Sequence, residues 1–172
     1  MSHVIATTLQ AFNALGDSDA YARLEHCCTS TRWIEGMLAR RPFDSESTLR
    51  VASDEVWHDC GVNDWLEAFE GHPKIGDMAS LQRKYADTQA LAAGEQAGVQ
   101  GAATDTLERL AAGNHEYEER FGFIFIVCAS GKSADEMLDL LEARLGNSRE
   151  EELSIAAQEQ RKITQIRLDT LL

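Results

Sequence analysis

Proline is scarce in this sequence, with Pro42 and Pro73 the only two among 172 residues. Proline breaks helices, and strong helix formers fill most of the chain, so long helices are expected. The four cysteines contain no Cys-x-x-Cys pair and show no metal-binding spacing. Their number and spacing predict neither a disulfide framework nor a cysteine metal site, and favour a reducing, cytoplasmic location.

Basic residues and long apolar runs are also few. Sixteen Lys and Arg stand against 29 Asp and Glu, a formal net charge of −13. This charge repels phosphate backbones and anionic membrane surfaces, so neither nucleic acid nor a membrane is an expected partner, and an anionic ligand needs a local cation. The longest apolar run, Phe121–Ala129, is too short to cross a bilayer, and no signal peptide is visible.

Helical periodicity dominates the rest of the chain. Its length fits one domain, residues 1–172, with a sizeable core. Two capping boxes, Ser-x-x-Glu at 133–136 and at 148–151, predict the starts of the last two helices. Asn63 is a good N-cap for a short helix that leads towards residue 72. The prediction is an all-α fold, a single-domain bundle of about eight helices.

Two stretches are harder to assign. Residues 81–97 have a helical pattern, and Gly98 and Gly101 are expected to interrupt it before a new helix begins near Thr104. Phe121–Ala129 is β-like in composition. Periodicity does not distinguish a buried extended segment from a buried helix there.

The loop Gly71–Asp77 holds the histidine best suited to chemistry. Pro73 pushes His72 towards extended dihedrals, and the glycines at 71 and 76 allow a sharp turn or a close approach to a ligand. We expect His72 on a stiff loop between helices, with a pKa near its ordinary ~6.5, where an imidazole exchanges protons at neutral pH. The alternative is an irregular connection that carries a polar surface residue.

The last helix contains an anomaly. At about 100° per residue, Gln160 and Arg167 fall in the middle of its apolar stripe, and Arg161 lies at the edge. An arginine that faces a core is costly unless a carboxylate, a phosphate or carbonyl groups receive it. Arg167 is therefore either a ligand-binding cation or a structural residue, in a buried ion pair or extended to solvent.

Two polar pairs suggest other chemistry. Glu95-Gln96 follows small residues and offers a carboxylate and an amide to a ligand, although a solvated helix face explains the pair equally well. His58-Asp59 suggests a metal-dependent phosphohydrolase, which requires further His and Asp ligands. A non-catalytic helical interaction domain, with an exposed apolar groove, is the remaining alternative.

The sequence contains several short motifs. Each is too short to be specific alone, but their order and spacing together are specific. The motifs are Arg41-Pro42-Phe43, His72-Pro73 with Ile75-Gly76, Glu95-Gln96, Asn114-x-x-Tyr117-x-x-Arg120-Phe121-Gly122-Phe123-x-Phe125, Glu152-Leu153, and Lys162-Ile163 leading to Arg167-Leu168. From about residue 12 to residue 172 the sequence resembles the family of 2-oxo-4-hydroxy-4-carboxy-5-ureidoimidazoline (OHCU) decarboxylases, which complete the conversion of urate to allantoin.

The resemblance implies an all-helical enzyme without cofactor or metal, a small ureido-imidazoline substrate and a homodimer. The family's catalytic positions fall on His72, Glu95 and Arg167. Its substrate-binding positions fall on Pro73, Ala92, Gln96, Phe125, Ile126, Val127, Cys128 and Ala129. Many members carry a serine three residues before the glutamate, and this chain has alanine there, so the resemblance does not carry over a hydroxyl contact.

The implied chemistry suits these residue types. The substrate carries a carboxylate and a hydroxyl on one ring carbon beside a carbon–nitrogen double bond, which accepts the electrons released with CO2. His72 and Glu95 are suited to proton transfer, with His72 expected as the proton donor. Arg167 supplies positive charge, while Gln96 and the backbone N–H groups of Phe125–Ala129 are expected to bind the substrate's amides.

Overall fold

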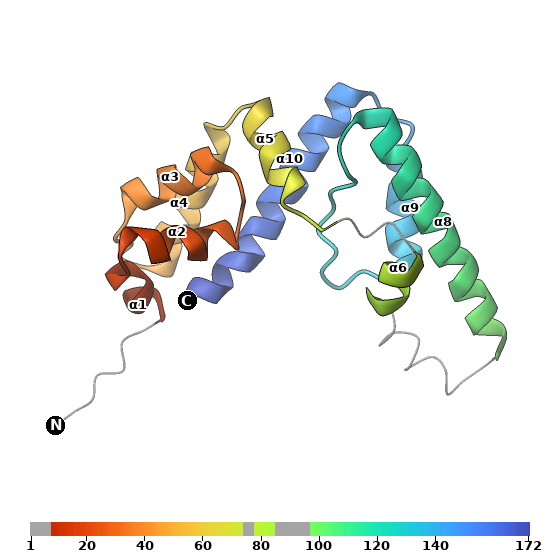
Figure 1. The fold of residues 1–172 in the computed structure, drawn as a ribbon, viewed down its shortest axis with the longest axis horizontal. Helices are drawn as coiled ribbons and strands as arrows, with labels where there is room; N and C mark the ends of the chain where they lie inside the picture. The colour runs from red at the N-terminus through yellow and green to blue at the C-terminus, as the bar shows by residue number, and fades with distance from the viewer. Residues whose placement is uncertain (1–7, 74–77, 85–96) are drawn as a thin grey trace. The chain divides into compact units, whose positions relative to one another are not determined.

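The computed structural model describes residues 8–73, 78–84 and 97–172 (Figure 1). Within these ranges the chain forms nine α-helices, one 3-10 helix and no β-strand, so the predicted all-α fold is confirmed. None of the described helices is both long and apolar enough to cross a membrane. The chain divides into two compact units, residues 1–72 with 157–172 and residues 73–156, and the prediction of a single domain stays a prediction.

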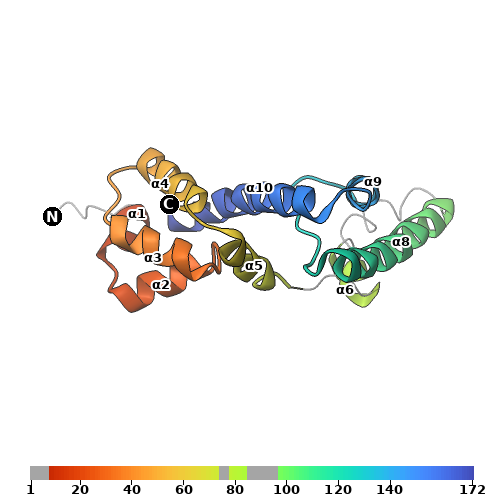
Figure 2. The ribbon, with the colours of Figure 1, turned by 90° about the horizontal axis from the view of Figure 1, so that it is seen from above.

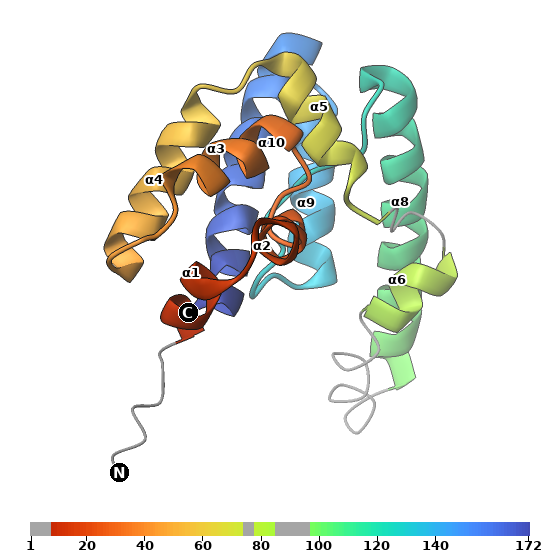
Figure 3. The ribbon, with the colours of Figure 1, turned by 60° about the vertical axis from the view of Figure 1, so that its left-hand side comes forward.

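The first unit contains five short helices and the C-terminal end of a long one. They are α1 (Thr8–Ala14), α2 (Asp17–Glu25), α3 (Thr31–Arg40), α4 (Glu46–His58), α5 (Val62–Glu70) and the end of α10 (Arg149–Arg167), which the 3-10 helix η1 (Leu168–Leu171) follows. Helix α3 lies between α2 and α4 and contacts both, as Figure 2 shows. Trp33, Ile34 and Met37 of α3 are fully buried in this core. Helix α1 packs against η1 (Figure 3).

The Arg41-Pro42-Phe43 motif ends α3 and binds it to α1. Arg41 Nη1 donates to the carbonyl oxygens of Phe12 (3.1 Å) and Leu15 (2.6 Å), which lie at the C-terminal end of α1. The Asn13 side chain forms two hydrogen bonds with the Phe43 backbone, at 2.8 and 2.9 Å. These contacts occupy backbone groups that a helix end leaves unpaired, so the motif has a structural role.

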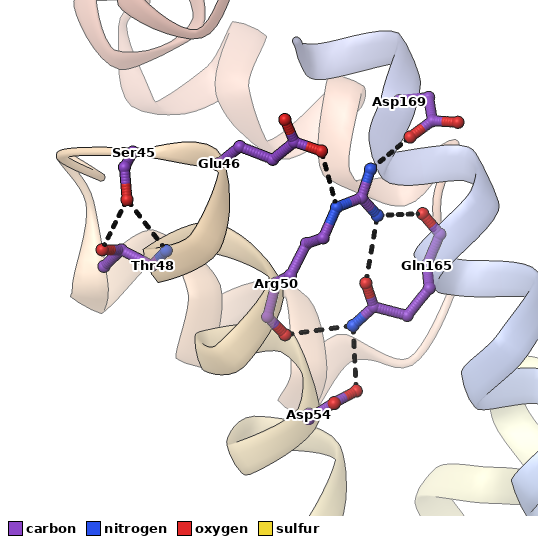
Figure 4. Close-up of polar contacts among 7 residues, drawn as sticks. All are labelled: Ser45, Glu46, Thr48, Arg50, Asp54, Gln165 and Asp169. Carbon is purple, nitrogen blue, oxygen red and sulfur yellow. Dashed lines mark hydrogen bonds and ion pairs between the residues drawn. The ribbon is translucent and has the colours of Figure 1, made fainter.

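A polar network joins α4 to the C-terminal end of α10 (Figure 4). Arg50 Nη1 donates to the backbone oxygen of Gln165 at 2.7 Å and to its side-chain oxygen at 3.1 Å. Arg50 also pairs with Glu46 and Asp169. The Gln165 amide donates in turn to the Arg50 carbonyl (3.0 Å) and to Asp54 (2.9 Å). This reciprocal pairing sets the position of α10 along α4.

Helix α5 leads directly to His72. It begins at Val62 rather than after Asn63, because the Asp64 carboxylate accepts a hydrogen bond from the Gly61 N–H at 2.9 Å and makes Gly61 the N-cap. The predicted N-cap at Asn63 is therefore wrong. At the other end, a Cβ on Gly71 would lie 2.1 Å from Thr29 Oγ1. Glycine is required there by close packing within the protein.

The second unit contains α6 (Met78–Lys84), α8 (Ala97–Phe121), α9 (Ala134–Arg144) and the start of α10. Helix α8 packs against both α6 and α9. It runs through positions 98 and 101, so the predicted interruption by glycine is wrong; a glycine inside a helix costs only ~1 kcal/mol relative to alanine. Both capping serines are confirmed: Ser133 Oγ accepts from the Glu136 N–H (3.2 Å) and Ser148 Oγ from the Glu151 N–H (3.1 Å).

The β-like stretch that follows α8 is extended. Helix α8 ends at Phe121, and Gly122 then adopts a φ of +81°, a left-handed conformation that glycine takes without strain. Residues 124–129 form neither helix nor strand. Of the two alternatives left open by periodicity, the extended segment is confirmed.

Candidate active site

His72 lies immediately after α5 and is half-buried. Its backbone N–H donates to the carbonyl oxygen of Phe69 at 3.2 Å, which continues the turn at the helix end. Its side-chain Nε2 lies 2.5 Å from Oε1 of Gln160, a residue of α10 that is only 1% exposed. His72 is therefore not a freely exposed surface side chain, and its catalytic role stays a prediction.

One face of α10 carries the residues that surround this imidazole. Gln160 Nε2 donates to Thr164 Oγ1 at 3.1 Å, and both residues are buried. Arg167 Nη2 lies 3.5 Å from Nδ1 of His72, and its side chain is half-buried. Positions 160, 164 and 167 are spaced i, i+4 and i+7, so they share a helix face. The inward direction predicted for Gln160 and Arg167 is confirmed.

Burial and a neighbouring cation set the protonation of His72. Removal from water lowers the pKa of His72 below its ordinary 6.5; the hydrogen bond to Gln160 opposes this shift, and the charge of Arg167 adds to it. The expectation of an unshifted pKa is therefore wrong. At neutral pH the imidazole is uncharged, so the resting side chain is able to accept a proton.

The predicted substrate-binding segment Phe125–Ala129 belongs to the second unit. Ile126 and Cys128 are buried, while the other three side chains are half-buried. Arg144 Nη1 donates to the Ile126 carbonyl at 2.6 Å, and Lys132 Nζ donates to the Cys128 carbonyl at 2.7 Å. Two side chains thus hold the carbonyl groups of this extended backbone in place.

A buried cluster within the second unit supports the same segment. Arg144 Nε donates to Glu152 Oε1 at 2.7 Å, Tyr117 O–H donates to Glu152 Oε1 at 2.6 Å, and Arg144 Nη2 lies 3.3 Å from the tyrosine oxygen. The Arg144 guanidinium also lies 4.6 Å from the centre of the Phe125 ring. Burial, followed by the bond to Glu152, raises the pKa of Tyr117. Tyr117 and Glu152, two residues of the motif pattern, therefore have a structural role in this cluster.

Sequence reasoning missed Arg144. The signal was available, because Arg144 follows Met137 and Leu141 at helical spacing on the buried face of α9. It also missed the contact between Gln160 and His72. The two residues are 88 positions apart in the sequence, and no local pattern brings them together.

Other predicted positions fall in three places. Pro73 is exposed directly after His72. Ala92, Glu95 and Gln96 lie outside the described residues, as does Gly76. His58 and Asp59 are exposed at the C-terminal end of α4, and across the described ranges no three His, Cys, Asp or Glu side chains gather as metal ligands.

The cysteines of the first unit are buried thiols. Burial raises the pKa of Cys27 to about 11, of Cys28 to about 12 and of Cys60 to about 11. Since the thiolate is the nucleophilic form, these groups are inert at neutral pH. These three cysteines are therefore not candidates for nucleophilic chemistry.

An uncharged, half-buried imidazole beside an arginine, in an all-helical chain, is an arrangement suited to binding a small anion next to a group that exchanges protons. The OHCU decarboxylase family model matches residues 13–169. The chain therefore belongs to the OHCU decarboxylase family.

Individual relatives agree with this assignment. The chain is 30% identical over 166 residues to the 2-oxo-4-hydroxy-4-carboxy-5-ureidoimidazoline decarboxylase of Haloferax volcanii, and the match covers 94% of each chain. It is 37% identical to the uric acid degradation bifunctional protein TTL of Arabidopsis thaliana, where the match covers 84% of this chain and 45% of that longer protein. A crystal structure of OHCU decarboxylase in the presence of (S)-allantoin superposes with a TM-score of 0.70 and 35% identity, over 91% of this chain and 98% of the other.

Proposed function

We propose that this protein is a cofactor-independent OHCU decarboxylase, which forms (S)-allantoin and CO2 in urate degradation. The observation that carries the proposal is the arrangement of His72, just after α5, and Arg167 of α10, with Gln160 in contact with the imidazole, in a chain of this family. The 3.5 Å approach of the Arg167 guanidinium to the His72 imidazole supports a site with a cation beside a proton-transferring group. An anionic substrate needs the cation, because the protein's net charge of −13 otherwise repels it.

The reaction breaks the bond between a ring carbon and its carboxylate. The released electron pair forms a double bond to the neighbouring carbon, and the adjacent carbon–nitrogen double bond accepts the displaced pair. The hydroxyl on the first carbon then loses its proton as that carbon becomes a carbonyl, the neighbouring carbon gains a proton from one face, and the ring nitrogen that took the displaced pair gains a proton from solvent. The enzyme must therefore remove one proton, deliver one proton to carbon and hold the carboxylate that leaves as CO2, with a net uptake of one proton.

Uncharged His72 is suited to remove the hydroxyl proton, because its lowered pKa leaves the imidazole free to accept one. The imidazolium that results is acidic and is then able to donate a proton. His72 thus accepts a proton first and donates one second, which reconciles its expected role as proton donor with its uncharged resting state. Arg167 binds the anionic substrate and disfavours a second positive charge on the imidazole before the substrate arrives.

The remaining contacts also belong to the proposal. Resemblance to the family supports a role for Glu95 in proton transfer, for Gln96 in binding the substrate's amides, and for Pro73 and Ala92 in substrate binding. The extended Phe125–Ala129 backbone offers N–H groups, and support for this comes from the side chains that hold its carbonyl groups in place. Resemblance to the family supports a homodimer, and free thiols at all four cysteines support a cytoplasmic location.

The test uses freshly generated OHCU and follows the optical activity of the allantoin formed. The expected result is (S)-allantoin produced faster than the spontaneous racemic background. A racemic product at the background rate would contradict the proposal. A parallel sample treated with a chelator is expected to keep its activity; activity lost with the chelator and restored by zinc or manganese would favour the metal-dependent hydrolase instead.

A further inference from the structure

The contact between Arg167 and His72 restricts where the imidazole carries its proton. A guanidinium has donors only and never accepts a hydrogen bond. Arg167 Nη2 faces His72 Nδ1 at 3.5 Å, so Nδ1 must present its lone pair on that side. The proton of the uncharged imidazole then lies on Nε2.

The position of this proton orients the amide of Gln160. Since Nε2 of His72 donates, the atom 2.5 Å away must be the amide oxygen, as the structure has it. The amide nitrogen then points to Thr164 Oγ1, 3.1 Å away, which accepts. Gln160 is 1% exposed and Thr164 4% exposed, so water does not compete for these groups.

We propose that Gln160 is a positioning residue that holds His72 in the Nε2–H tautomer, and that Thr164 holds Gln160 in the orientation this requires. The chain of contacts runs from Thr164 through Gln160 and His72 to Arg167. This chain of contacts leaves Nδ1 of His72 unprotonated next to Arg167, the cation that we propose binds an anionic ligand. The catalytic consequence rests on the proposed decarboxylase function, whereas the tautomer itself does not.

The decisive measurement is a long-range ¹⁵N–¹H correlation spectrum of the histidine side chains at neutral pH, recorded on the whole protein. His72→Asn assigns the signals, because one of the five histidine patterns disappears. We expect His72 to show the Nε2–H pattern in the wild type. An Nδ1–H pattern, or an even mixture, would overturn the proposal whether or not the protein has decarboxylase activity.

Variants of Gln160 separate positioning from packing. Gln160→Leu removes the acceptor and is expected to mix the two tautomers and lower kcat by ~10-fold or more, since a positioned acid or base contributes ~10²–10⁴-fold. Gln160→Glu keeps an acceptor and is expected to retain the Nε2–H pattern. Gln158→Leu makes the same change at an exposed position of α10 and should alter neither the tautomer nor kcat.

Thr164 gives a milder pair of variants should Gln160→Leu fail to fold. Thr164→Val removes the hydroxyl at nearly constant volume and is expected to raise the Nδ1–H fraction and lower kcat several-fold, while Thr164→Ser retains the wild-type pattern. A tautomer and kcat unchanged in Thr164→Val would overturn the role of Thr164. A lower kcat in Gln160→Leu with an unchanged tautomer would overturn the positioning role of Gln160.

Discussion

Arg144 of the second unit and Arg167 of the first differ in how fully their guanidinium groups are used. In the second unit, Arg144 directs all three guanidinium nitrogens to protein acceptors: Glu152, Ile126 and Tyr117. In the first unit, the guanidinium of Arg167 makes one hydrogen-bond contact among the described residues, the 3.5 Å approach to His72. The side chains of Arg144 and Glu152 are 8% and 0% exposed, whereas Arg167 is only half-buried.

This difference separates a structural cation from a ligand-binding one. A buried guanidinium whose three nitrogens all meet protein acceptors is committed to the fold, and removing it leaves its partner charge buried and unpaired. A half-buried guanidinium with unused donors is able to bind an anion from solvent. The same logic applies to Tyr117, whose oxygen contacts Glu152 and Arg144, and to His72, whose Nδ1 faces the Arg167 guanidinium as its one partner within the described ranges.

The largest expected effect lies in the first unit. His72→Asn removes the proton-transferring group, so we expect kcat for (S)-allantoin to fall by ~10²–10⁴-fold. The free energy of unfolding should fall by no more than about 1–3 kcal/mol, because Gln160 loses one partner. Stopped assays beside a urea melt measure both; a variant that retains more than about a tenth of the rate would place His72 with the structural residues.

Arg144→Met tests the second unit. It leaves Glu152 charged and buried without its cation, which typically costs ~3–5 kcal/mol. We expect this loss in the free energy of unfolding, measured by circular dichroism in urea. A stability equal to the wild type with a selective loss of activity would show that Arg144, too, acts on a ligand, and the distinction between the two arginines would fail.

Arg167→Met makes the same substitution at the other arginine and serves as the matched comparison. Loss of a charge-assisted contact costs roughly 1.5–3 kcal/mol, so KM for OHCU should rise about 10- to 100-fold. The unfolding free energy should stay close to that of the wild type. If Arg167→Met instead unfolded readily and bound substrate normally, Arg167 would be the structural residue.

The smallest effect is a pH dependence of stability. The folded pKa of His72 lies below its unfolded value of 6.5, so between the two the unfolded chain binds more protons. This contribution to stability is full above about pH 6.5 and is lost as pH falls through the folded pKa. The difference in unfolding free energy between wild type and His72→Asn should therefore shrink on acidification from pH 7.5; an increase would contradict the lowered pKa.

The sequence alone determined the helical class, the capped starts of α9 and α10, and the inward face of α10 that holds Gln160 and Arg167. These features depend on contacts between neighbours three or four positions apart, which periodicity records directly. Short motifs in the right order also identified the family before any geometry was known. Local patterns predicted helix boundaries poorly where a residue destabilises a helix only slightly. Helix α8, for example, continues through two glycines near its start.

Only the tertiary structure decided what each polar residue does. His72 contacts Gln160, which lies 88 positions away in the sequence. Burial lowers the pKa of His72 and the hydrogen bond to Gln160 opposes that shift, and no local sequence pattern contains either effect. Arg144 and Arg167 look alike as single basic residues on apolar helix faces. What distinguishes them is how many acceptors distant segments bring within hydrogen-bonding distance, because the cost of a buried charge depends on its partners in space and not on its neighbours in sequence.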